Sequence, residues 1–413
     1  MQAPPYSTRV DEILTRAFIE NPHPVFARLR DEAPISRVGD TGVHLVATWD
    51  LIEEVLGRES DFSANLTGML MQDPDGQPML FPLPTTGANQ VIATADEPDH
   101  SVHRALAQPR LSTRRVAAME EQIRGWSKAA IEPFIDAQGG DFIPIAEVIP
   151  ARVVAALLGL PDGDVSRHRQ WAMMGGDMLA GPVDQQTMAT LTAETASMSE
   201  YLFTHLESAR KKRRADPEAP MLHALARGVD EGAISSQQAV GIAVVMFGAG
   251  GESTAALIGN MMYRLATDPD VANRLRAEPS LVSRFVEEVA RLDSPFTFHY
   301  RVVRNACELG GAELAPGDRL MLLWASANRD ADHFEDPDAL RLDRKHPKNH
   351  LSFGRGAHFC IGGPLARLEA RVVCEELLAG TRELSLSAEH PAVFAQSLFV
   401  HRYDELPVVA RPA

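Results

Sequence analysis

A glycine-rich stretch around a single cysteine constrains this chain more than any other part of its sequence. Residues 351–370 read LSFGRGAHFCIGGPLARLEA, with Cys360 among glycines at positions 354, 356 and 362. Glycine allows positive φ and lets a backbone approach a flat ligand closely. The run GPLARLEA predicts a helix with proline in its first turn. A sulfur at the start of that helix meets unpaired amides and the positive end of the helix dipole, which both favour the metal-binding thiolate.

The residues around the cysteine also follow a recognisable order. The pattern FGxGxHxCxG is formed by Phe353, Gly354, Gly356, His358, Cys360 and Gly362. It resembles the haem-binding signature of the cytochrome P450 family, in which a cysteine thiolate holds the iron. The resemblance implies that Cys360 is the metal ligand of haem b (iron protoporphyrin IX). A zinc site or a nucleophile is the alternative for a His-x-Cys pair, but the sequence shows no second ligand pair and no convincing base.

The same resemblance sets an expectation for the whole chain. It implies that residues 1–413 form a single P450 domain, mainly α with a smaller β region, and residues 1–20 are expected to form a loose N-terminal arm that runs into a short helix. The haem is expected between a long central helix and the helix after the cysteine loop. The segments Ile35–Val38 and Val43–Ala47, joined by GDTG, predict a β-hairpin at the start of the β region.

Composition bears on location and partners. The sequence shows no apolar leader and no apolar run that we expect to span a bilayer. Its three cysteines do not form a disulfide framework, so a reducing compartment is expected. The formal net charge of −16 argues against nucleic acid as a partner. We therefore expect a cytoplasmic protein with neither a membrane nor a nucleic-acid partner.

A long central helix is predicted from Ser235–Ser236 to Thr267. At about 1.5 Å per residue it reaches about 45–50 Å, enough to cross the molecule. Its apolar centre is interrupted by GAGGEST at residues 248–254. Each glycine costs roughly 1 kcal/mol in a helix interior relative to alanine. Three glycines beside a carboxylate and two hydroxyls therefore indicate a site.

That segment resembles the family's oxygen-binding kink. The resemblance places Ala249 and Gly250 against the haem and gives catalytic roles to Glu252, Ser253 and Thr254, with Glu252 and Ser253 delivering protons to bound dioxygen. Ser253 stands where the family more often has threonine. Serine keeps the hydroxyl but loses the methyl group that stiffens χ1, so the change bears on how tightly electrons are coupled to product. The alternative is a packing notch that contains a hydrogen-bonded serine.

Cationic side chains for the haem propionates are the next prediction. His100 and Arg104 lie four residues apart in a predicted helix and share one face. The segment resembles the family's propionate-binding helix, and His358 joins it from the cysteine loop. Arg301 is the expected second arginine, with Arg304 as the alternative.

A structural ion pair is predicted from Glu288 and Arg291, three residues apart on one helical face. They match the family's ExxR pair, which implies burial and a third partner. Arg344, in the stretch before the cysteine loop, is the expected partner. These residues are assigned to folding and not to catalysis.

The substrate pocket is the least constrained part. Residues 62–94 show little periodicity and predict a long loop over the pocket, for which a mobile surface loop is the alternative. His299 is a candidate polar contact. The candidate wall residues are Leu66, Met69, Leu70, Phe81, Met174, Val245, Phe296, Thr297, Phe298, Leu398 and Phe399.

The function implied by the resemblance is a haem-thiolate monooxygenase. It inserts one atom of O2 into an apolar small molecule, by hydroxylation or epoxidation, with electrons from a ferredoxin or flavodoxin and its reductase and NAD(P)H as the distant donor. A peroxide-driven oxygenase and a non-enzymatic haem sensor remain as alternatives. The expected docking residues for the redox partner are Arg110, Arg114, Lys345, Lys348 and Arg367.

Overall fold

Helices dominate the fold. The computed structural model describes residues 12–83, 90–212 and 219–413. It is 56% helix and 15% strand, which confirms the mainly α class with a smaller β region. The helices are α1 (Arg16–Glu20), α2 (His23–Glu32), α3 (Trp49–Gly57), α4 (Asp99–Ala107), α5 (Thr113–Ala118), α6 (Glu120–Asp136), α7 (Ile143–Leu158), α8 (Val165–Met178), α9 (Gln185–Lys212), α10 (Met221–Asp230), α11 (Ser236–Thr267), α12 (Pro269–Ala277), α13 (Val282–Leu292), α14 (Trp324–Ala327) and α15 (Gly363–Gly380).

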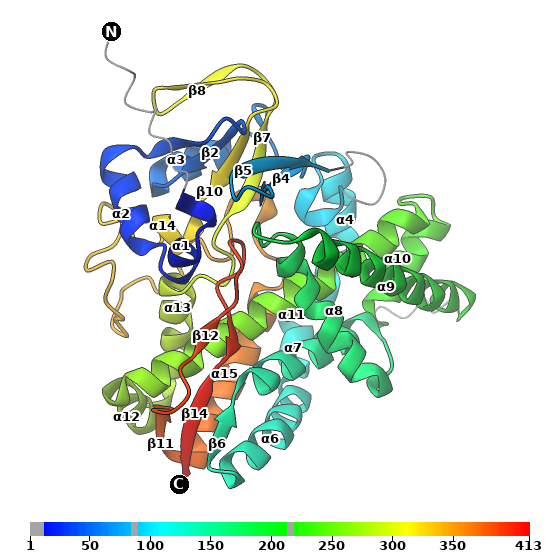
Figure 1. The fold of residues 1–413 in the computed structure, drawn as a ribbon. Helices are drawn as coiled ribbons and strands as arrows, with labels where there is room; N and C mark the ends of the chain where they lie inside the picture. The colour runs from blue at the N-terminus through cyan, green and yellow to red at the C-terminus, as the bar shows by residue number, and fades with distance from the viewer. Residues whose placement is uncertain (1–11, 84–89, 213–218) are drawn as a thin grey trace.

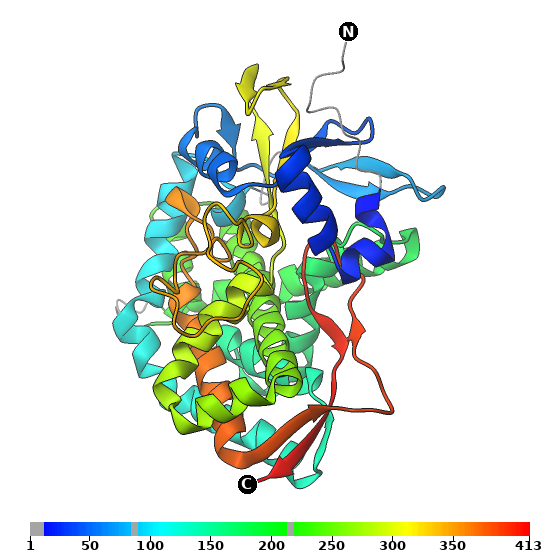
Figure 2. The same cartoon turned by 90° about the vertical axis from the view of Figure 1, so that its left-hand side faces the viewer.

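The long helix α11 lies at the centre of the molecule. It begins with a capping box, in which Ser235 accepts from the amide of Gln238 and the Gln238 side chain accepts from the amide of Ser235. Helices α7, α8, α9 and α15 pack around it, as Figures 1 and 2 show. The predicted start and end of this helix are confirmed.

The expectation about apolar runs needs a correction at α11. Its best window has a mean hydropathy of 1.5, so by length and composition alone the helix could cross a membrane. In the folded protein 61% of that window is buried, and the apolar residues contact other helices. Its apolar character therefore matches its position at the core of the fold.

Small residues allow α8 to cross α11 closely. A Cβ added at Gly251 of α11 would lie 2.5 Å from the Cβ of Ala172 on α8, and Gly248 faces Gly175 nearby. Larger side chains at these positions would separate the helices. The glycines of GAGGEST thus serve packing as well as the site.

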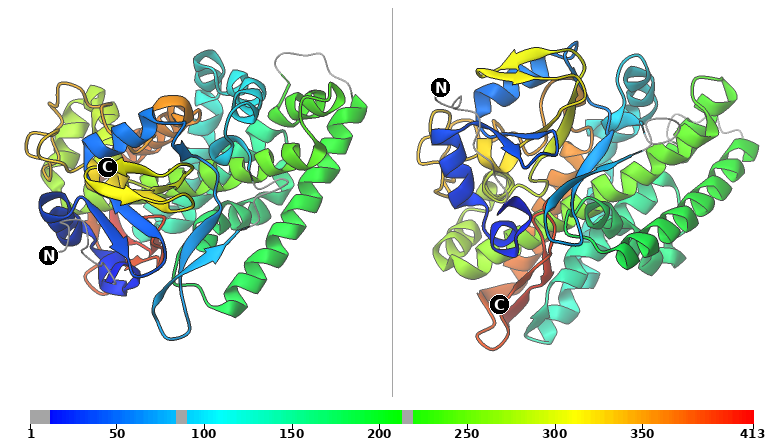
Figure 3. Two further views of the ribbon diagram at one scale, coloured as in Figure 1. Left: turned by 90° about the horizontal axis from the view of Figure 1, so that it is seen from above. Right: turned by 45° about the horizontal axis from the view of Figure 1, so that its top comes forward.

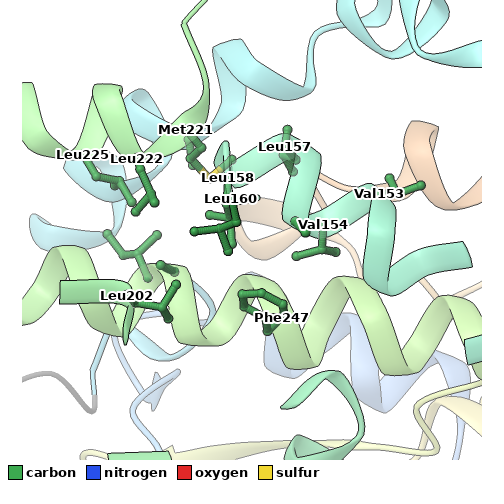
Figure 4. Packing of buried hydrophobic residues seen from close by; sticks show 14 of the residues in the cluster. Val153, Val154, Leu157, Leu158, Leu160, Leu202, Met221, Leu222, Leu225 and Phe247 are labelled. Atoms are coloured by element: carbon green, nitrogen blue, oxygen red, sulfur yellow. The ribbon is translucent and has the colours of Figure 1, made fainter. Parts of the chain in front are cut away.

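One large apolar cluster packs α7, α9 and α10 against α11. Figure 4 shows Leu157 and Leu158 of α7, Leu202 of α9 and Leu222 of α10 gathered around Phe247 of α11. All of these are buried except for a small part of Leu157. The cluster fixes the half of α11 that precedes the GAGGEST segment.

The β region carries one wall of the site. Its main sheet has the order β1-β2-β10-β7-β3, and the predicted hairpin is confirmed by antiparallel pairing of the first two strands. Figure 3 shows its blue and yellow strands side by side. The strands are β1 (Ile35–Val38), β2 (Val43–Val46), β3 (Phe62–Ser63), β7 (His299–Val303) and β10 (Arg319–Leu322).

Smaller sheets complete the fold. A three-stranded sheet packs against α6 and α15 at the C-terminal end, and three hairpins lie at the periphery. The three-stranded sheet contains β6 (Gly139–Asp141), β11 (Thr381–Leu386) and β14 (Pro407–Pro412). The hairpins are β4 (Gly68–Gln72) with β5 (Pro78–Pro82), β8 (Cys307–Leu309) with β9 (Ala312–Leu314), and β12 (Val393–Phe394) with β13 (Tyr403–Glu405).

Two expectations about irregular segments are wrong in part. Residues 62–94 contain the β4–β5 hairpin, whose consecutive Met, Leu and Phe residues pair across the strands. The arm runs into the expected short helix, α1, but regular structure already begins at residue 12 with a 3-10 turn. Ile13 and Phe18 from this segment are buried against the β region. Residues 1–11 and 84–89 lie outside the described part of the chain.

Candidate active site

Cys360 lies at the N-terminus of α15. Its amide donates to the carbonyl of Phe353 at 2.8 Å, which closes the loop that precedes the helix. The amides of Gly362 and Gly363 donate to the sulfur and lower the pKa of the thiol, but burial has the larger effect and raises it. Hydrogen bonds that stabilise the thiolate are therefore present before any ligand binds.

A cavity of about 210 Å³ opens between this sulfur and α11. Its lining includes many of the predicted site residues from α4, α11, β7 and the cysteine loop. The predicted members among its lining residues are His100, Arg104, Val245, Ala249, Gly250, Ser253, Thr254, Phe296, Arg301, Phe353, Gly354, His358, Cys360 and Gly362. Segments from four parts of the sequence therefore meet at one site.

One side of the cavity is cationic. The rings of His100 and His358 lie with centroids 4.0 Å apart and planes tilted by 31°, and His100 Nδ1 lies 3.1 Å from the carboxylate of Glu97. Arg104 donates to the carbonyls of Ala357 and Phe359 at 3.0 and 2.8 Å, so it also braces the cysteine loop. Burial, followed by the charge of Arg301, lowers the pKa of His358 to about 3.

The two candidate arginines are distinguished by their surroundings. Arg301 is 8% exposed, and among the described residues no carboxylate forms an ion pair with it. Burial lowers its pKa to about 10. Arg304 instead forms a 2.6 Å ion pair with Asp96, and its side chain is 42% exposed. Arg301 therefore presents to the cavity a buried charge on which Asp96 and Glu59 act without forming an ion pair, whereas Arg304 does not line this cavity.

The hydroxyls of α11 and the neighbouring acid lie in different places. Ser253 and Thr254 line the cavity, and Ser253 Oγ donates to the Ala249 carbonyl at 2.5 Å. Glu252 is absent from the lining and fully buried between α11 and α8. It accepts from the amide of Gly176 at 2.5 Å and from Arg402 at 3.2 Å. Glu252 and Ser253 are thus neighbours in the sequence, but only Ser253 lines the cavity.

The surroundings of Glu252 favour its neutral form. Burial raises the pKa of its carboxyl group to about 8, although Arg402 acts in the opposite direction. Arg402 also pairs with Asp177 at 2.7 Å. The sequence analysis did not find Arg402, because nothing in its local pattern marks it.

The predicted wall residues divide into two groups. Val245 and Phe296 line the cavity. Met69 and Leu70 are buried in the β4–β5 hairpin, and Phe81 is 38% exposed on its outer side. The remaining predicted wall residues lie in the packing layer behind the cavity, partly around a smaller cavity of about 10 Å³. These are Leu66, Met174, Thr297, Phe298, Leu398 and Phe399.

His299 is a polar member of the cavity wall. Its Nδ1 accepts from the indole N–H of Trp324 at 2.7 Å. The ring packs against Phe296 and Phe399, each with centroids 5.4 Å apart. Burial lowers its pKa to about 3, so the ring is neutral, with its proton on Nε2.

Glu369 is a site residue that the sequence analysis did not select. It lies two turns into α15, is 2% exposed and lines the cavity. Among the described residues, none donates a hydrogen bond to its carboxyl group or pairs with it, and Oε2 is enclosed. A charged residue in an otherwise apolar stretch of the α15 face was the available signal.

Buried ion pairs hold the cysteine loop from behind. Glu288 binds Arg291 through two 3.0 Å hydrogen bonds and Arg344 at 2.9 Å, which confirms the predicted triad. Although burial raises the pKa of Glu288, the Arg291 hydrogen bonds lower it overall. The neighbouring Glu287 binds His350 and Arg367 at 3.0 and 2.7 Å, and so joins α13 to both ends of the loop.

The basic residues expected at the docking face are not equivalent. Arg114, Lys345 and Lys348 are exposed. Arg110 is only 6% exposed, and Arg367 is engaged with Glu287. Two of the five expected docking residues are therefore poor candidates for contact with a partner.

Comparison with known proteins gives the family. The Cytochrome P450 family model matches residues 184–382. Cytochrome P450 144 of Mycobacterium tuberculosis is 37% identical over 399 residues, which covers 95% of this chain and 90% of that protein. The chain belongs to the cytochrome P450 family. The Vitamin D(3) 25-hydroxylase of Pseudonocardia autotrophica is 30% identical, covering 98% of both chains. The crystal structure of CYP109E1 from Bacillus megaterium in complex with testosterone aligns with a TM-score of 0.83 at 28% identity, covering 96% of this chain and 99% of that one.

Membership of the P450 family makes the protein a haem-dependent monooxygenase, an oxidoreductase that uses O2, an organic substrate and electrons from a redox partner. Two buried groups in the cavity wall fit a haem. Arg301 is a buried cation without a carboxylate, and His358 Nδ1 is buried without a hydrogen-bond partner in the described chain. Both suit the carboxylates of a porphyrin, and the sulfur of Cys360 in the same cavity wall suits the thiolate ligation that P450 enzymes use. No cluster of three or more His, Cys, Asp or Glu side chains that could hold a metal occurs among the described residues.

Proposed function

We propose that this protein inserts one oxygen atom of O2 into a C–H or C=C bond of an apolar molecule, by hydroxylation or epoxidation. The observation that carries the proposal is the shared cavity: the sulfur of Cys360 and the hydroxyls of Ser253 and Thr254 line the same space. The haem, when bound, supplies the oxygen chemistry, with electron donation from the thiolate favouring O–O cleavage.

The residues of the cysteine loop hold the cofactor in this proposal. Cys360 binds the iron through Sγ, and the amides of Gly362 and Gly363 spread the sulfur's negative charge. His100, Arg104, Arg301 and His358 bind the two carboxylates, which would otherwise be buried anions. Ala249, Gly250, Phe353, Gly354 and Gly362 line the same cavity and would leave room for the flat porphyrin.

The polar residues of α11 deliver protons in this proposal. Ser253 and Thr254 present hydroxyl groups at the cavity, and each can donate one proton while accepting another. Glu252 acts as the acid behind them after its carboxyl group leaves Arg402 and the Gly176 amide. The buried pose of Glu252 therefore represents a resting state, in which the acid is kept from the cavity.

The substrate is an apolar molecule with a rigid skeleton in this proposal. Val245 and Phe296 form part of an apolar wall, and His299 adds one hydrogen-bond donor through Nε2. Two similar proteins act on or bind sterol-like molecules, because CYP109E1 was crystallised in complex with testosterone and the other relative is a vitamin D(3) 25-hydroxylase. We infer that this chain takes a molecule of that class.

The proposal extends to partners and setting. A ferredoxin or flavodoxin with its reductase delivers electrons from NAD(P)H at the exposed side of the cysteine loop, near Arg114, Lys345 and Lys348. Residues 1–413 act as one domain in the cytoplasm. Because the contact joins opposite charges, reduction should slow as ionic strength rises. A reduction rate that does not change with salt would remove this part of the proposal.

The first test is the absorbance spectrum of the reduced, carbon monoxide-bound protein. We expect the strongly red-shifted Soret band of a thiolate-ligated haem in the wild type and its loss in Cys360→Ala. Cys374→Ala is the matched control, since Cys374 is buried in α15 away from the cavity. A histidine-type band in the wild type, or an unchanged band in Cys360→Ala, would overturn the proposal.

The second test separates the oxygenase from its alternatives. Testosterone and vitamin D3 are added while the haem spin state is followed, and product is then sought with a ferredoxin and reductase plus NADPH. Product from this system supports the proposal. Product from hydrogen peroxide alone would instead support a peroxide-driven oxygenase, which the withdrawal of Glu252 from the cavity favours as the second candidate.

A further inference from the structure

Ile92 has an unusual backbone conformation for its residue type. Its φ is 41°, in the left-handed region, where a β-branched residue is an outlier. Residues held in such regions carry strain, persist only where the surrounding structure over-determines them, and cluster at functional sites. Ile92 is 5% exposed and lines the large cavity, so this strained residue is part of the wall of the active site.

His103 of α4 accepts a hydrogen bond from the strained residue. Ile92 lies in the 3-10 turn Ile92–Thr94, and its amide donates to His103 Nδ1 at 3.2 Å. Because Nδ1 accepts, the ring proton of His103 is on Nε2. The ring is fully buried, and Nε2 has no hydrogen-bond partner in the described chain. An unpaired buried donor is costly, and a leucine at this position would fill the space without that cost.

The turn is also fastened on both sides of Ile92. The side chain of Gln90 binds the amide and the carbonyl of Leu66, each at 3.0 Å. The side chain of Asn65 donates to the carbonyl of Thr94 at 2.8 Å. These contacts join the turn to residues 65–66, and the contact with His103 joins it to α4. The left-handed conformation of Ile92 is therefore over-determined by its surroundings.

The ring of His103 stays neutral and can keep this contact. Burial lowers its pKa, and His100 acts in the same direction, whereas the carboxylate of Asp99 acts in the opposite one. A protonated ring would carry a donor at Nδ1 and could not accept from the amide of Ile92.

We propose that His103 is a positioning residue that sets which molecules the active site accepts, because it holds the strained backbone of Ile92 and with it one part of the cavity wall. The turn contacts both α4 and α11, the helix that carries Ser253 and Thr254. Without the contact Ile92 can relax to negative φ, and a wall that is no longer held yields more readily to a large ligand. This inference rests on the proposed function in one respect, that the cavity takes a haem and a substrate.

The first experiment measures selectivity with two ligands of the haem iron, imidazole and 4-phenylimidazole. Each is added to the haem-loaded protein while the Soret band is followed, and the two differ by one phenyl ring. In His103→Leu, the Kd of 4-phenylimidazole divided by the Kd of imidazole should fall by about tenfold, the low end for a small change in an apolar pocket. A ratio equal to that of the wild type would overturn the proposal.

His103→Asn is the matched variant. Asparagine places Oδ1 where the histidine has Nδ1, so it can accept from the amide of Ile92, and it should keep the wild-type ratio. A role in packing alone predicts the reverse, because leucine fills the buried space and asparagine does not. The same change of ratio in both variants would therefore overturn the proposal. If His103→Leu does not fold, His103→Gln replaces it, because its amide group lies one bond too far from the backbone.

The second experiment tests the strain by thermal unfolding. Glycine adopts positive φ without a Cβ penalty, so an Ile92→Gly chain does not need His103 to hold the turn. In the wild-type chain His103→Leu should lower Tm by about 2 °C or more. In the Ile92→Gly chain the same change should leave Tm unchanged or raise it, since it removes the unpaired N–H. An equal fall of Tm in both chains would show that His103 acts independently of this backbone and would refute its positioning role.

The two proposals fail in different ways. If the wild type lacks the thiolate-type carbon monoxide band, the proposed function fails, and the unfolding experiment still tests the contact between His103 and Ile92 because it needs no ligand. If that band is normal but the ratio of Kd values does not change in His103→Leu, only the proposal for His103 fails.

Discussion

The carboxyl group of Glu252 and the guanidinium of Arg402 form a buried pair, with Oε1 and Nε 3.2 Å apart. Glu252 lies in the middle of α11, whereas Arg402 lies near the C-terminus, directly before β13. Arg402 also binds Asp177, and Glu252 also binds the amide of Gly176, so both ends of the contact reach α8. This contact links α11, the roof helix α8 and the C-terminal segment.

Gly176 leaves the space that the Glu252 carboxyl group occupies. A Cβ at this position would lie 2.2 Å from Glu252 Oε1 and 2.6 Å from Val400 Cγ2. We expect Gly176→Ala to lower stability by about 1–3 kcal/mol, the usual cost of overpacking, and hence to lower Tm. Gly125→Ala is the control, because Gly125 lies inside α6 with no atom within 4 Å. That variant should be neutral or more stable by up to about 1 kcal/mol. Equal melting of the two variants would contradict the prediction.

Glu252 should make stability depend on pH. Its pKa is about 8 in the folded protein against 4.5 for the ordinary group. Between these values the folded state keeps a proton that the unfolded state has lost, so stability falls as pH rises through this window. Glutamine does not titrate, so we expect the Tm of wild type minus that of Glu252→Gln to fall from pH 5 to pH 8. Across the whole window between the two pKa values, the contribution of Glu252 to the free energy of unfolding should fall by roughly 3–5 kcal/mol. A difference that stays constant with pH would show that Arg402 keeps Glu252 ionised throughout.

Arg301 and Arg304 should differ in their effect on haem retention. Arg301 is a buried cavity residue without a carboxylate partner, whereas Arg304 is paired with Asp96. A lost hydrogen bond to a charged group is worth about 1.5–3 kcal/mol. We therefore expect Arg301→Gln to release haem to apomyoglobin at least about tenfold faster. Arg304→Gln should release it within about twofold of the wild-type rate, the scale of an exposed ion pair. Equal rates for the two variants would refute the assignment of Arg301.

The triad of Glu288, Arg291 and Arg344 should be required for a folded cysteine loop. Removing one member of a buried ion pair costs about 3–5 kcal/mol, since it leaves an uncompensated charge. We expect Glu288→Ala to give little soluble, haem-loaded protein, measured as haem absorbance per mole of purified chain. Glu20→Ala breaks the exposed Arg16–Glu20 pair instead and should change stability by less than about 0.5 kcal/mol. Normal haem loading in Glu288→Ala would show that the triad is dispensable.

Local sequence patterns predicted what depends on nearby residues. Ser235–Ser236 and Thr267 were predicted as the start and end of α11, and the GDTG turn predicted the β1–β2 hairpin. The spacing of Glu288 and Arg291 predicted their pairing on one helical turn. In each case the interacting residues lie within one turn or one hairpin, so their geometry follows from the backbone repeat.

The β4–β5 hairpin shows where local patterns fail. Its strands contain consecutive apolar residues on both faces, so the period of two that marks a strand is absent from residues 68–82. Proline and glycine in the same tract favoured a loop. Cross-strand pairing of Met69 with Phe81 and of Leu70 with Leu80 decides the structure instead.

The sequence by itself determined the family, the cysteine loop and the central helix, because these depend on contiguous motifs whose residues act together. Only the tertiary structure decided which charged groups reach the cavity. Glu252 and Ser253 are neighbours in the chain, but helical geometry points them about 100° apart, so one meets Arg402 and the other meets the cavity. Glu369 lies in the cavity because α15 turns that face toward α11, a relation between two helices that no local pattern records.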